Sequence, residues 1–503
     1  MPAHPIRGLT PLEAFRRLRG RARPFWLDAA STADGLGRYS FLSCEPSEIL
    51  ALDADAGRPA HLGDGEDAFA ALEAAARRTA YDPGVPGPCP VWVGALGYDL
   101  RRLCERLPAR VPAEGGVPDL AFARYPAVLR CDHETGDAVV LGADEAAVAA
   151  LCGWLAAPAP PLPAPPVVGA LVPDQTPAAY TAAVDRILEY LRAGDVYEVC
   201  YTLRCRAPLR GDPAGLYLVL RALAPAPLGA FLPCGDAVLL SNSPELFLAF
   251  DPATRYVESR PIKGTRPRGH DDADDERLRR DLHADAKEIA EHVMIVDLVR
   301  NDLGRVAVVG SVAVAGYGRN VALPTVHHRV SSVAATLRPG VGLAALLRAT
   351  FPGGSVTGAP KVRAMEIIDE LEPCRRGPYC GAFGYVGARG EVMLAMAIRT
   401  ALFAPARAAA PAPTPAAGAR APAPAAGARA GSAPADARQP AAGTLHLHVG
   451  GAIVADSDPA RELQETRDKA LAFTRAIALL HDAGGARPSP PAPLPAPALA
   501  PGT

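Results

Sequence analysis

The feature that most constrains the fold is a low-complexity tract between two strand-like segments. Residues 404–442 are almost wholly Ala, Pro, Gly and Arg, a composition that buries too little apolar surface to pack, so we expect disorder. The flanking segments, VMLAMAIRTALF and TLHLHVGGAIV, have the apolar and β-branched character of strands. The sequence therefore predicts one hairpin with a long insertion at its tip.

Two further biased tracts divide the rest of the chain. Residues 156–168 are rich in Pro and Ala and are typical of a linker between regions. Residues 485–503 have a similar composition and are predicted to be a disordered tail. The linker separates an N-terminal region, residues 1–155, from a second region, residues 169–484.

Both regions have mixed strand and helix patterns. The N-terminal region alternates short strand-like runs with helical segments such as residues 67–79. In the second region, TPAAYTAAVDRILEYLRAGD has apolar residues at helical spacing and ends at Gly194, as a helix capped by glycine would. Long helices are predicted over residues 274–300 and 458–483, with strands between them. The predicted fold class is α+β.

Charge and cysteine usage narrow the functional class. The chain has 52 Lys and Arg against 54 Asp and Glu, a formal net charge of -2, so no basic field indicates nucleic acid or membrane as a partner. The ten cysteines form no CxxC pair, which favours reduced thiols over disulfides or zinc. No run of about 18 uncharged apolar residues occurs, and we expect a cytoplasmic protein that acts on a small molecule.

Two predicted helices carry glutamate pairs at the same spacing. Glu288 and Glu291 lie three residues apart, as do Glu462 and Glu465. Residues three apart share a helix face, so each pair could present oxygen ligands to a shared Mg²⁺ ion. The alternative is two ordinary solvated helices, because ExxE is common on helix surfaces. Lys469 extends the second face by one turn.

Lys263 stands between Pro261 and Gly264, in ESRPIKGTRPRG, where a strand is expected to end near a cleft. A lysine is nucleophilic only when neutral, and burial or neighbouring cations would lower its pKa enough to supply that form. The alternative is a surface charge. Glu245 and His328 have side chains suited to proton transfer, although a lone Glu or His is usually structural or exposed.

A glycine-rich turn precedes one predicted helix. In FPGGSVTGAPKVRAMEIIDELEP, glycines and hydroxyls come directly before KVRAMEIIDEL. Such a turn can aim backbone N–H groups at an anionic ligand near the helix N-terminus. The order GxxxxGK[ST] is absent, so it is no Walker P-loop. A plain loop-to-helix turn is the alternative.

These motifs, in this order, resemble those of the chorismate-binding enzyme family. The resemblance is carried by SPELF, RPIKGTRPRG, EHVMIVDLVRNDLGRV, GSVTGAPKVRAMEIIDELEP, RRGPYCGAFGY, AIRT and GGAIVADSDP. It covers residues 170–480 strongly and the N-terminal region more weakly, through GRYSFLSCEP and GALGYDL. It implies a fold of antiparallel sheets packed as a sandwich with helices outside, related to anthranilate synthase component I.

The resemblance also implies a set of site residues. Glu288, Glu291, Glu462 and Glu465 match the family's Mg²⁺ site, where the ion would neutralise the ring carboxylate of chorismate. His328 matches a histidine near the C4 hydroxyl that leaves. The implied substrate-binding residues are Thr265, Thr357, Tyr379, Arg399, Gly451, Ala452 and Lys469. Tyr379 and Arg399 match groups that hold the pyruvyl carboxylate, and most of the others surround the ring carboxylate.

Lys263 separates the subfamilies, because aminodeoxychorismate synthases resemble this chain in reading PIKGT where anthranilate synthases read PIAGT. The implied reaction is that of an Mg-dependent transferase. Lys263 attacks C2 of chorismate while the C4 hydroxyl leaves with a proton from Glu245, and ammonia then attacks C4 to give 4-amino-4-deoxychorismate. Isochorismate and salicylate synthases use a lysine base at the position of Glu198, so the resemblance argues against them.

The chain departs from the family pattern at a few positions. Many relatives read QVN where this chain has Glu198, Val199 and Cys200, and the third glycine near the ring carboxylate is Ala452. A backbone N–H contact at Ala452 would survive the change. The product could feed 4-aminobenzoate for folate or a specialised metabolite such as an antibiotic.

No glutaminase motif occurs in the chain, so the expected partners are a separate glutamine amidotransferase subunit that supplies ammonia and a separate aminodeoxychorismate lyase. Two alternatives remain open at this stage. One is anthranilate synthase component I, which would aminate C2 without a covalent lysine. The other is a non-catalytic chorismate- or tryptophan-binding homologue.

Overall fold

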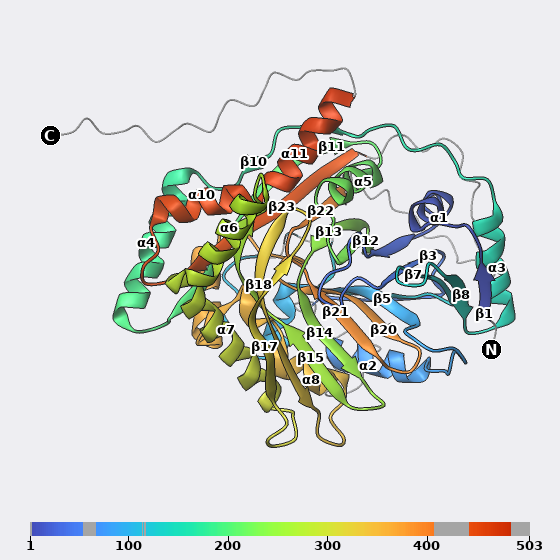
Figure 1. The fold of residues 1–503 in the computed structure, drawn as a ribbon, viewed down its shortest axis with the longest axis horizontal. Coiled ribbons are helices and arrows are strands. Elements are labelled where there is room, and N and C mark those ends of the chain that lie inside the picture. The colour runs from blue at the N-terminus through green and yellow to red at the C-terminus, as the bar shows by residue number, and fades with distance from the viewer. Residues whose placement is uncertain (1–2, 54–66, 113, 115–116, 407–441, 484–503) are drawn as a thin grey trace, which may run out of the picture.

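The computed structural model describes residues 3–53, 67–112, 114, 117–406 and 442–483 (Figure 1). Within these residues the chain forms two large sheets with helices outside them, and every strand pair is antiparallel. One continuous apolar core contains side chains from both sheets. The predicted α+β fold, with antiparallel sheets in a sandwich, is confirmed.

The first sheet has 13 strands. In spatial order its main path is β1 (Ala3–Ile6), β8 (Ala138–Gly142), β7 (Ala127–Asp132), β3 (Tyr39–Ser43), β2 (Phe25–Asp28), β12 (Leu228–Cys234), β13 (Ala237–Ser243), β22 (Thr400–Pro405), β23 (Ala442–Ile453), β11 (Glu198–Arg210) and β10 (Val172–Pro173). The short strands β9 (Val167–Val168) and β19 (Gly358–Ala359) also pair with β11.

The second sheet has ten strands. Its main path is β16 (Ile262–Pro267), β18 (Val326–Thr336), β15 (Tyr256–Arg260), β14 (Leu246–Asp251), β21 (Val392–Met396), β20 (Ala382–Gly387), β5 (Pro90–Leu96), β6 (Leu120–Arg124) and β4 (Glu48–Leu52). The remaining strand, β17 (Ala313–Ala322), pairs with β18.

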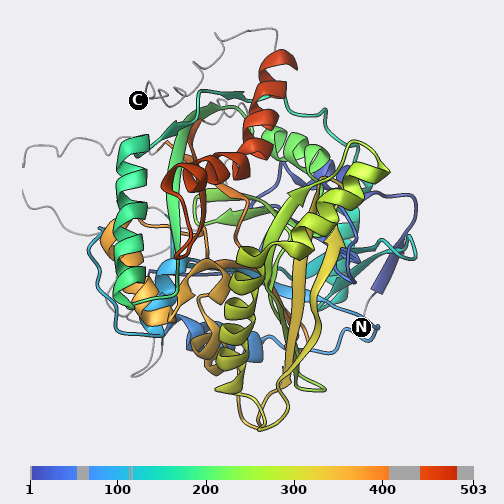
Figure 2. The same cartoon turned by 60° about the vertical axis from the view of Figure 1, so that its left-hand side comes forward.

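Helices cover the outside of the sheets (Figure 2). They are α1 (Pro11–Leu18), α2 (Ala68–Arg78), α3 (Glu145–Ala156), α4 (Pro177–Ala193), α5 (Pro213–Leu223), α6 (Asp272–Ala284), α7 (Ala286–Gly304), α8 (Leu343–Thr350), α9 (Lys361–Leu371), α10 (Pro459–Lys469) and α11 (Leu471–Ala483), with 3₁₀ turns η1 (Tyr98–Leu103) and η2 (Gly354–Val356). In the described residues no helix is long and apolar enough to cross a membrane.

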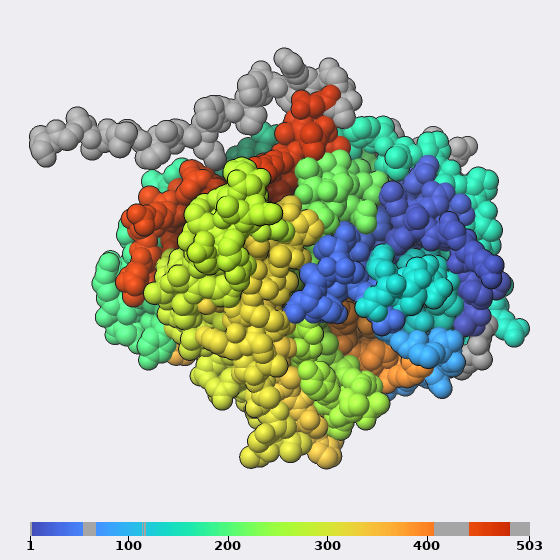
Figure 3. All heavy atoms as spheres, in the orientation of Figure 1, coloured from blue at the N-terminus to red at the C-terminus, as the bar shows by residue number. Residues whose placement is uncertain are grey.

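Strands from both sides of the predicted linker build each sheet. In the first sheet β2 pairs with β12, and in the second β5 pairs with β20. The last residues of the linker form β9, which pairs with β11. The space-filling view shows the N-terminal strands (blue and cyan) on the same face as the segment from α6 to β18 (yellow-green to yellow; Figure 3). The N-terminal region therefore completes the sheets of the second region.

The predicted hairpin around the low-complexity tract is confirmed. Strands β22 and β23 are antiparallel neighbours, and their register runs from Ala401 opposite Leu447 to Pro405 opposite Gly443. The predicted insertion is slightly too long, because Ala404 and Pro405 belong to β22 and the strand β23 begins at residue 442. The disorder predicted for the rest of the insertion and for the tail concerns residues 407–441 and 484–503, outside the described residues.

The predicted helix that ends at Gly194 is confirmed as α4, and Gly194 closes it in the left-handed region at φ +81°. The two predicted long helices are wrong in extent, because each is divided in two. Asp285 separates α6 from α7: its extended backbone ends the first helix, and its carboxylate accepts a hydrogen bond from the Glu288 N–H as the N-cap of the second. Ala470 separates α10 from α11.

Candidate active site

The predicted site residues gather where β11 and β23 of the first sheet approach β16 and β18 of the second, beside α7 and α10. Lys263 and Thr265 lie on β16, His328 on β18, Gly451 and Ala452 on β23, Glu288 and Glu291 on α7, and Glu462, Glu465 and Lys469 on α10. Glu245, Thr357, Tyr379 and Arg399 lie in connections between elements.

Lys263 is buried between the two sheets. Its Nζ donates a hydrogen bond of 2.6 Å to Oε1 of Glu198, the first residue of β11. Burial lowers the pKa of Lys263, but Cys200, Glu198 and Glu291 act against it, and the net result is a pKa well above the usual range. The expectation that neighbouring cations lower this pKa is wrong, because the nearest charged group is a carboxylate. Lys263 is therefore an ammonium ion in this structure.

Gly264 allows β16 to approach α7 closely. Its backbone has φ +93°, in the left-handed region that favours glycine, and a Cβ at this position would clash with Oε2 of Glu288. A larger residue would therefore strain the strand and displace the glutamate. This explains why the residue after Lys263 is a glycine.

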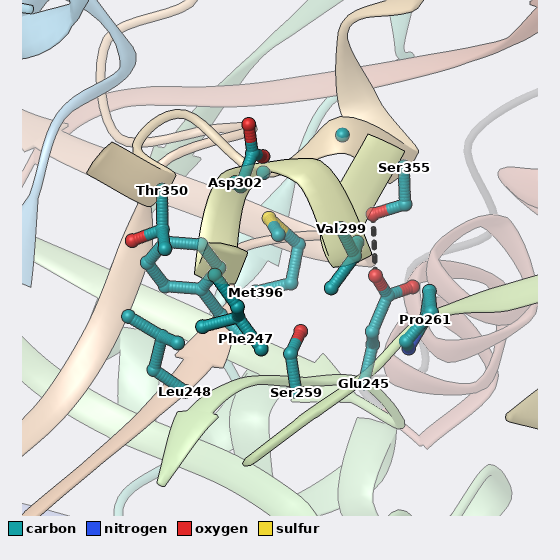
Figure 4. Close-up of a pocket in the computed structure, with 13 residues that line it drawn as sticks. Glu245, Phe247, Leu248, Ser259, Pro261, Val299, Asp302, Thr350, Ser355 and Met396 are labelled. Carbon is teal, nitrogen blue, oxygen red and sulfur yellow. Dashed lines mark hydrogen bonds between the residues drawn. The ribbon is translucent and has the colours of Figure 1, made fainter. Parts of the chain in front are cut away.

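Glu245 is a buried carboxyl group near Lys263 that is suited to hold a proton. It is 3 % exposed, and burial raises its pKa to about 7, against the lowering effects of a hydrogen bond from Ser355 and of the charge of Lys263. Figure 4 shows the Glu245 carboxylate and the Ser355 hydroxyl joined at the edge of an apolar cavity, which Phe247 and Met396 also line. At neutral pH this carboxyl group exists in both protonation states.

His328 is held as a neutral imidazole between two partners. An Nη2–H of Arg399 donates to its Nε2 at 3.2 Å, and Thr265 Oγ1 lies 2.9 Å from its Nδ1. Because an arginine can only donate, Nε2 is the acceptor and Nδ1 carries the proton. Burial, together with the charge of Arg399, holds the pKa of His328 well below its usual range.

Arg399 has no carboxylate partner among the described ion pairs, and its backbone has φ +50°. Burial lowers its pKa, against the raising effects of Glu245 and Tyr379. Tyr379 stacks on His448 with ring centroids 5.3 Å apart. Thr357 is fully buried, and its hydroxyl donates to backbone carbonyls, 3.1 Å from that of Gly353. Arg399 is thus an uncompensated cation inside the site, suited to an anionic ligand.

The glutamates of α7 lie near basic side chains. Arg266 forms an ion pair with Glu288, while Oε2 of Glu288 is buried without a hydrogen-bond partner. Burial raises the pKa of Glu291 to about 7, partly offset by the charge of Lys263. Lys287 joins the two helices, because its Nζ lies 2.8 Å from Oε1 of Glu462 and 3.9 Å from Oε1 of Glu291.

The glutamates of α10 converge on β23 at Gly451. A Cβ on Gly451 would lie 3.6 Å from Oε2 of Glu462 and 3.7 Å from Oε1 of Glu465. Lys469 lies 2.8 Å from Glu465, whose pKa it lowers, and donates to the Gly450 carbonyl at 2.9 Å. Side-chain exposure rises from 10 % at Lys263 to 53 % at Glu465, so the site opens toward solvent beside α10.

The two glutamate pairs are neighbours without forming a closed metal cage. In the part of the chain that the structure describes, no three His, Cys, Asp or Glu side chains are close enough to hold a metal ion. The donor set nevertheless fits Mg²⁺, because carboxylate oxygens are its preferred ligands and Oε2 of Glu288 has a free lone pair. Lys287 stands between the pairs and contacts a glutamate of each.

Comparison with known proteins identifies the scaffold. The family described as chorismate binding enzyme matches residues 30–412. The chain belongs to this family. This chorismate-binding enzyme is 39 % identical over 393 residues to anthranilate synthase component 1 of Thermus thermophilus, covering 76 % of this chain and 77 % of that one. It is 38 % identical over 378 residues to aminodeoxychorismate synthase component 1 of Klebsiella aerogenes, covering 75 % of each.

A solved structure agrees with this assignment. Anthranilate synthase component I from Streptococcus pneumoniae matches with a TM-score of 0.70 and 28 % identity, over 87 % of this chain and 92 % of that one. The fold and the substrate class of this chorismate-binding enzyme are thereby fixed. The relatives divide between two named activities, so the position of amination rests on individual residues.

Sequence reasoning missed three residues of this chorismate-binding site. The sequence marks Glu198 as a departure from QVN and as the position of a lysine base in isochorismate and salicylate synthases, but does not predict that it is the direct partner of Lys263. Ser355 donates to Glu245, and Lys287 bridges α7 and α10. A local signal existed for Ser355, in the GGSVTG turn. The contacts of Glu198 and Lys287 join segments distant in sequence, so no local pattern indicates them.

Proposed function

We propose that the chain is the chorismate-utilising component I of an aminodeoxychorismate synthase. The observation that carries this proposal is the placement of Lys263, whose amine lies inside the site beside Glu198 and within electrostatic range of Glu245 and Glu291. An alanine there, as in PIAGT, would leave no amine at this position. A lysine provides one.

Substrate binding would use the unpaired charges of the site. Arg399, with Tyr379 beside it, is suited to the pyruvyl carboxylate of chorismate, because its guanidinium has no carboxylate partner among the described residues. We propose that Glu288, Glu291, Glu462 and Glu465 hold Mg²⁺, which would neutralise the ring carboxylate. Binding of the ion there would require Lys287 to leave Glu462.

The reaction that these residues support is a displacement in two stages. The neutral amine of Lys263 forms a bond to C2, the ring double bond shifts, and the C4–O bond breaks. Glu245 gives its proton to the departing oxygen, which leaves as water; a carboxyl group with a pKa of about 7 suits this role at neutral pH. Ammonia then forms the C4–N bond, the double bond returns, and the bond from C2 to Lys263 breaks.

His328 would orient groups near C4 and is no proton donor at Nε2, since that nitrogen accepts from Arg399. We propose that a separate glutamine amidotransferase subunit supplies the ammonia and that a separate lyase converts 4-amino-4-deoxychorismate to 4-aminobenzoate. The component 1 in the names of several relatives is consistent with a second subunit.

A second candidate is anthranilate synthase component I, favoured by the 39 % identity to the Thermus thermophilus relative. It would use the same carboxylate anchors but aminate C2, with no covalent bond to the enzyme. The two candidates predict different products from the same substrates.

The deciding experiment is a product assay. The purified protein is incubated with chorismate, Mg²⁺ and ammonium, with and without an aminodeoxychorismate lyase, and the products are separated by chromatography. We expect 4-aminobenzoate only when the lyase is present. Formation of anthranilate without the lyase would establish the second candidate instead, and tight chorismate binding without any product would contradict both.

A further inference from the structure

The pair formed by Lys263 and Glu198 poses a chemical problem for the proposed function. An ammonium ion has no lone pair and cannot attack carbon, so Lys263 must lose a proton before it reacts. The side chains of the pair are 10 % and 0 % exposed. Water therefore has little access to the ammonium group, and the proton needs an acceptor within the protein.

Glu198 is placed to be that acceptor. Its Oε1 accepts the 2.6 Å hydrogen bond from Lys263, and its Oε2 is buried with no hydrogen-bond partner among the described residues. Glu372, a buried carboxylate of the structural network, uses both oxygens with Arg376 and Thr202. The unused oxygen of Glu198 therefore leaves capacity for a proton that the structure does not otherwise require.

The other charged or titratable groups around Lys263 are less well placed. They come from four elements or connections: Cys200 on β11, Glu291 and His292 on α7, Glu245 before β14, and Glu465 on α10. Among the described residues only Glu198 is hydrogen bonded to Nζ of Lys263. Glu245 is already assigned to the leaving hydroxyl, and Glu291 to the cation.

We propose that Glu198 is the general base that takes the proton from Lys263 and so generates the nucleophilic amine. The inference rests on the proposed function, in which Lys263 bonds to C2. In this step one N–H bond of the ammonium breaks and one O–H bond forms on Glu198, leaving a neutral amine beside a neutral carboxylic acid. The pair has the same net charge before and after, so no ion has to enter or leave the buried space.

The same pair can act in reverse at the second stage. When ammonia displaces Lys263 from C2, the departing nitrogen carries away the electron pair of the C2–N bond. Glu198, now a carboxylic acid 2.6 Å away, returns its proton to that nitrogen and restores the ion pair. One carboxylate thus serves both bond formation and bond cleavage at C2.

The test measures adduct formation without ammonia, which isolates the first stage. Wild type and Glu198→Gln are mixed with chorismate and Mg²⁺, quenched at short times and analysed by intact-protein mass spectrometry for a mass increase of chorismate less one water. In Glu198→Gln the lysine proton must go to solvent. At pH values below the pKa of Lys263, the fraction of this lysine present as the neutral amine then grows about tenfold for each unit by which the pH rises.

The decisive quantity is the rate of the variant divided by the rate of wild type at each pH. The protonation of Glu245 affects both proteins equally and cancels in this ratio. We expect a ratio of about 0.1 or less at pH 7 that rises by up to about tenfold per pH unit toward pH 9. Glu198→Asp, which keeps a carboxylate, should recover part of the rate and lose the pH dependence of the ratio. A Glu198→Gln ratio near one, or one independent of pH, overturns the proposal.

Two controls separate this inference from the proposed function. Asp302→Asn breaks another lysine–carboxylate pair, the 2.6 Å bond from Lys361. It should alter stability, but its rate of adduct formation divided by that of wild type should not change with pH. If this ratio rose with pH as steeply as that of Glu198→Gln, a specific role for Glu198 would be contradicted. Peptide mapping should place the wild-type adduct on Lys263. Absence of a wild-type adduct would overturn the proposed function itself, whereas an adduct unaffected by Glu198→Gln overturns only the role of Glu198.

Discussion

Arg376 and Arg399 lie in neighbouring parts of the same molecule and differ in how their charges are met. Arg376 donates from Nε and Nη2 to Glu372, from Nη1 to the Val356 carbonyl and from Nη2 to the Cys200 carbonyl. Among the described residues the Arg399 guanidinium donates only to a neutral imidazole and forms no ion pair with a carboxylate. Both guanidinium groups are held in place, but only one is neutralised.

The difference teaches how to recognise a reactive region inside a well-packed protein. The Arg376 region is a structural network. Burial lowers the pKa of Arg376, but Glu372, Tyr98 and Cys380 together raise it well above its usual range. In the site, burial lowers the pKa of Arg399, and Oε2 of Glu198 and of Glu288 have no partner. The two regions therefore differ in whether a buried charge meets an opposite charge: Glu372 neutralises Arg376, whereas Arg399 has no carboxylate partner among the described residues.

The largest expected effect is on chemistry at Lys263. Lys263→Ala should lower the rate of C4 amination with ammonia by at least about 10³-fold, because the covalent route is lost while binding remains. The measurement is the lyase-coupled assay at saturating chorismate. Lys361→Ala is the matched control and should retain the rate per folded molecule within about tenfold. Full activity in Lys263→Ala would show that the lysine does not form the bond.

The second largest effect is expected on stability, at Arg376. Arg376→Ala leaves Glu372 buried without its partner, and we expect a loss of about 3–5 kcal/mol in the free energy of unfolding. Denaturant unfolding measures it directly. If Arg376→Ala unfolded at the same denaturant concentration as wild type, the network around it would not be structural.

Arg399 should respond in the opposite way. Arg399→Ala removes a cation without an ion-pair partner, so we expect no loss of thermal stability, while KM for chorismate rises by about 10- to 100-fold because a charge-assisted hydrogen bond to the substrate is lost. Steady-state kinetics and thermal melts on the same preparations check this. An unchanged KM with a lowered melting temperature would place Arg399 with Arg376 as a structural residue.

The smallest effect concerns the pH dependence set by Glu245. The acid that protonates the leaving hydroxyl must itself be protonated, so the rate of adduct formation should fall as pH rises through about 7, the pKa of Glu245. The Ser355 hydrogen bond lowers this pKa, so Ser355→Ala should move the falling limb to higher pH. A limb that moved to lower pH, or did not move, would contradict the role of Ser355.

Much of the fold could be predicted because its signals are local. The helix that ends at Gly194 and the hairpin around the insertion follow from apolar spacing, a glycine cap and β-branched residues. The break at Asp285 could not be predicted, since helical spacing continues across it. It depends on the cap from Asp285 to Glu288 and on the ion pair of Asp285 with Arg266, on a strand in the second sheet.

The site was predictable by residue type but not by electrostatics. The positions of Lys263, Glu245 and the glutamates follow from motifs, and the structure brings them together. The protonation of Lys263 was not predictable, because Glu198 lies 65 residues away and on the other sheet. The charge of Lys263 depends on a contact with the first residue of β11, a strand of the other sheet. No sequence pattern near Lys263 indicates that contact.

The hairpin of β22 and β23 has a consequence for how this enzyme can vary. The insertion enters the sheet at Ala442, and Gly451 in the site lies nine residues further along β23, a distance of roughly 30 Å at about 3.3 Å per residue. Over this whole length β23 pairs with β11 in one continuous register. Evolution can therefore lengthen, shorten or replace the segment at one end while selection for catalysis acts on the other, and the same tip offers a place to graft a second domain.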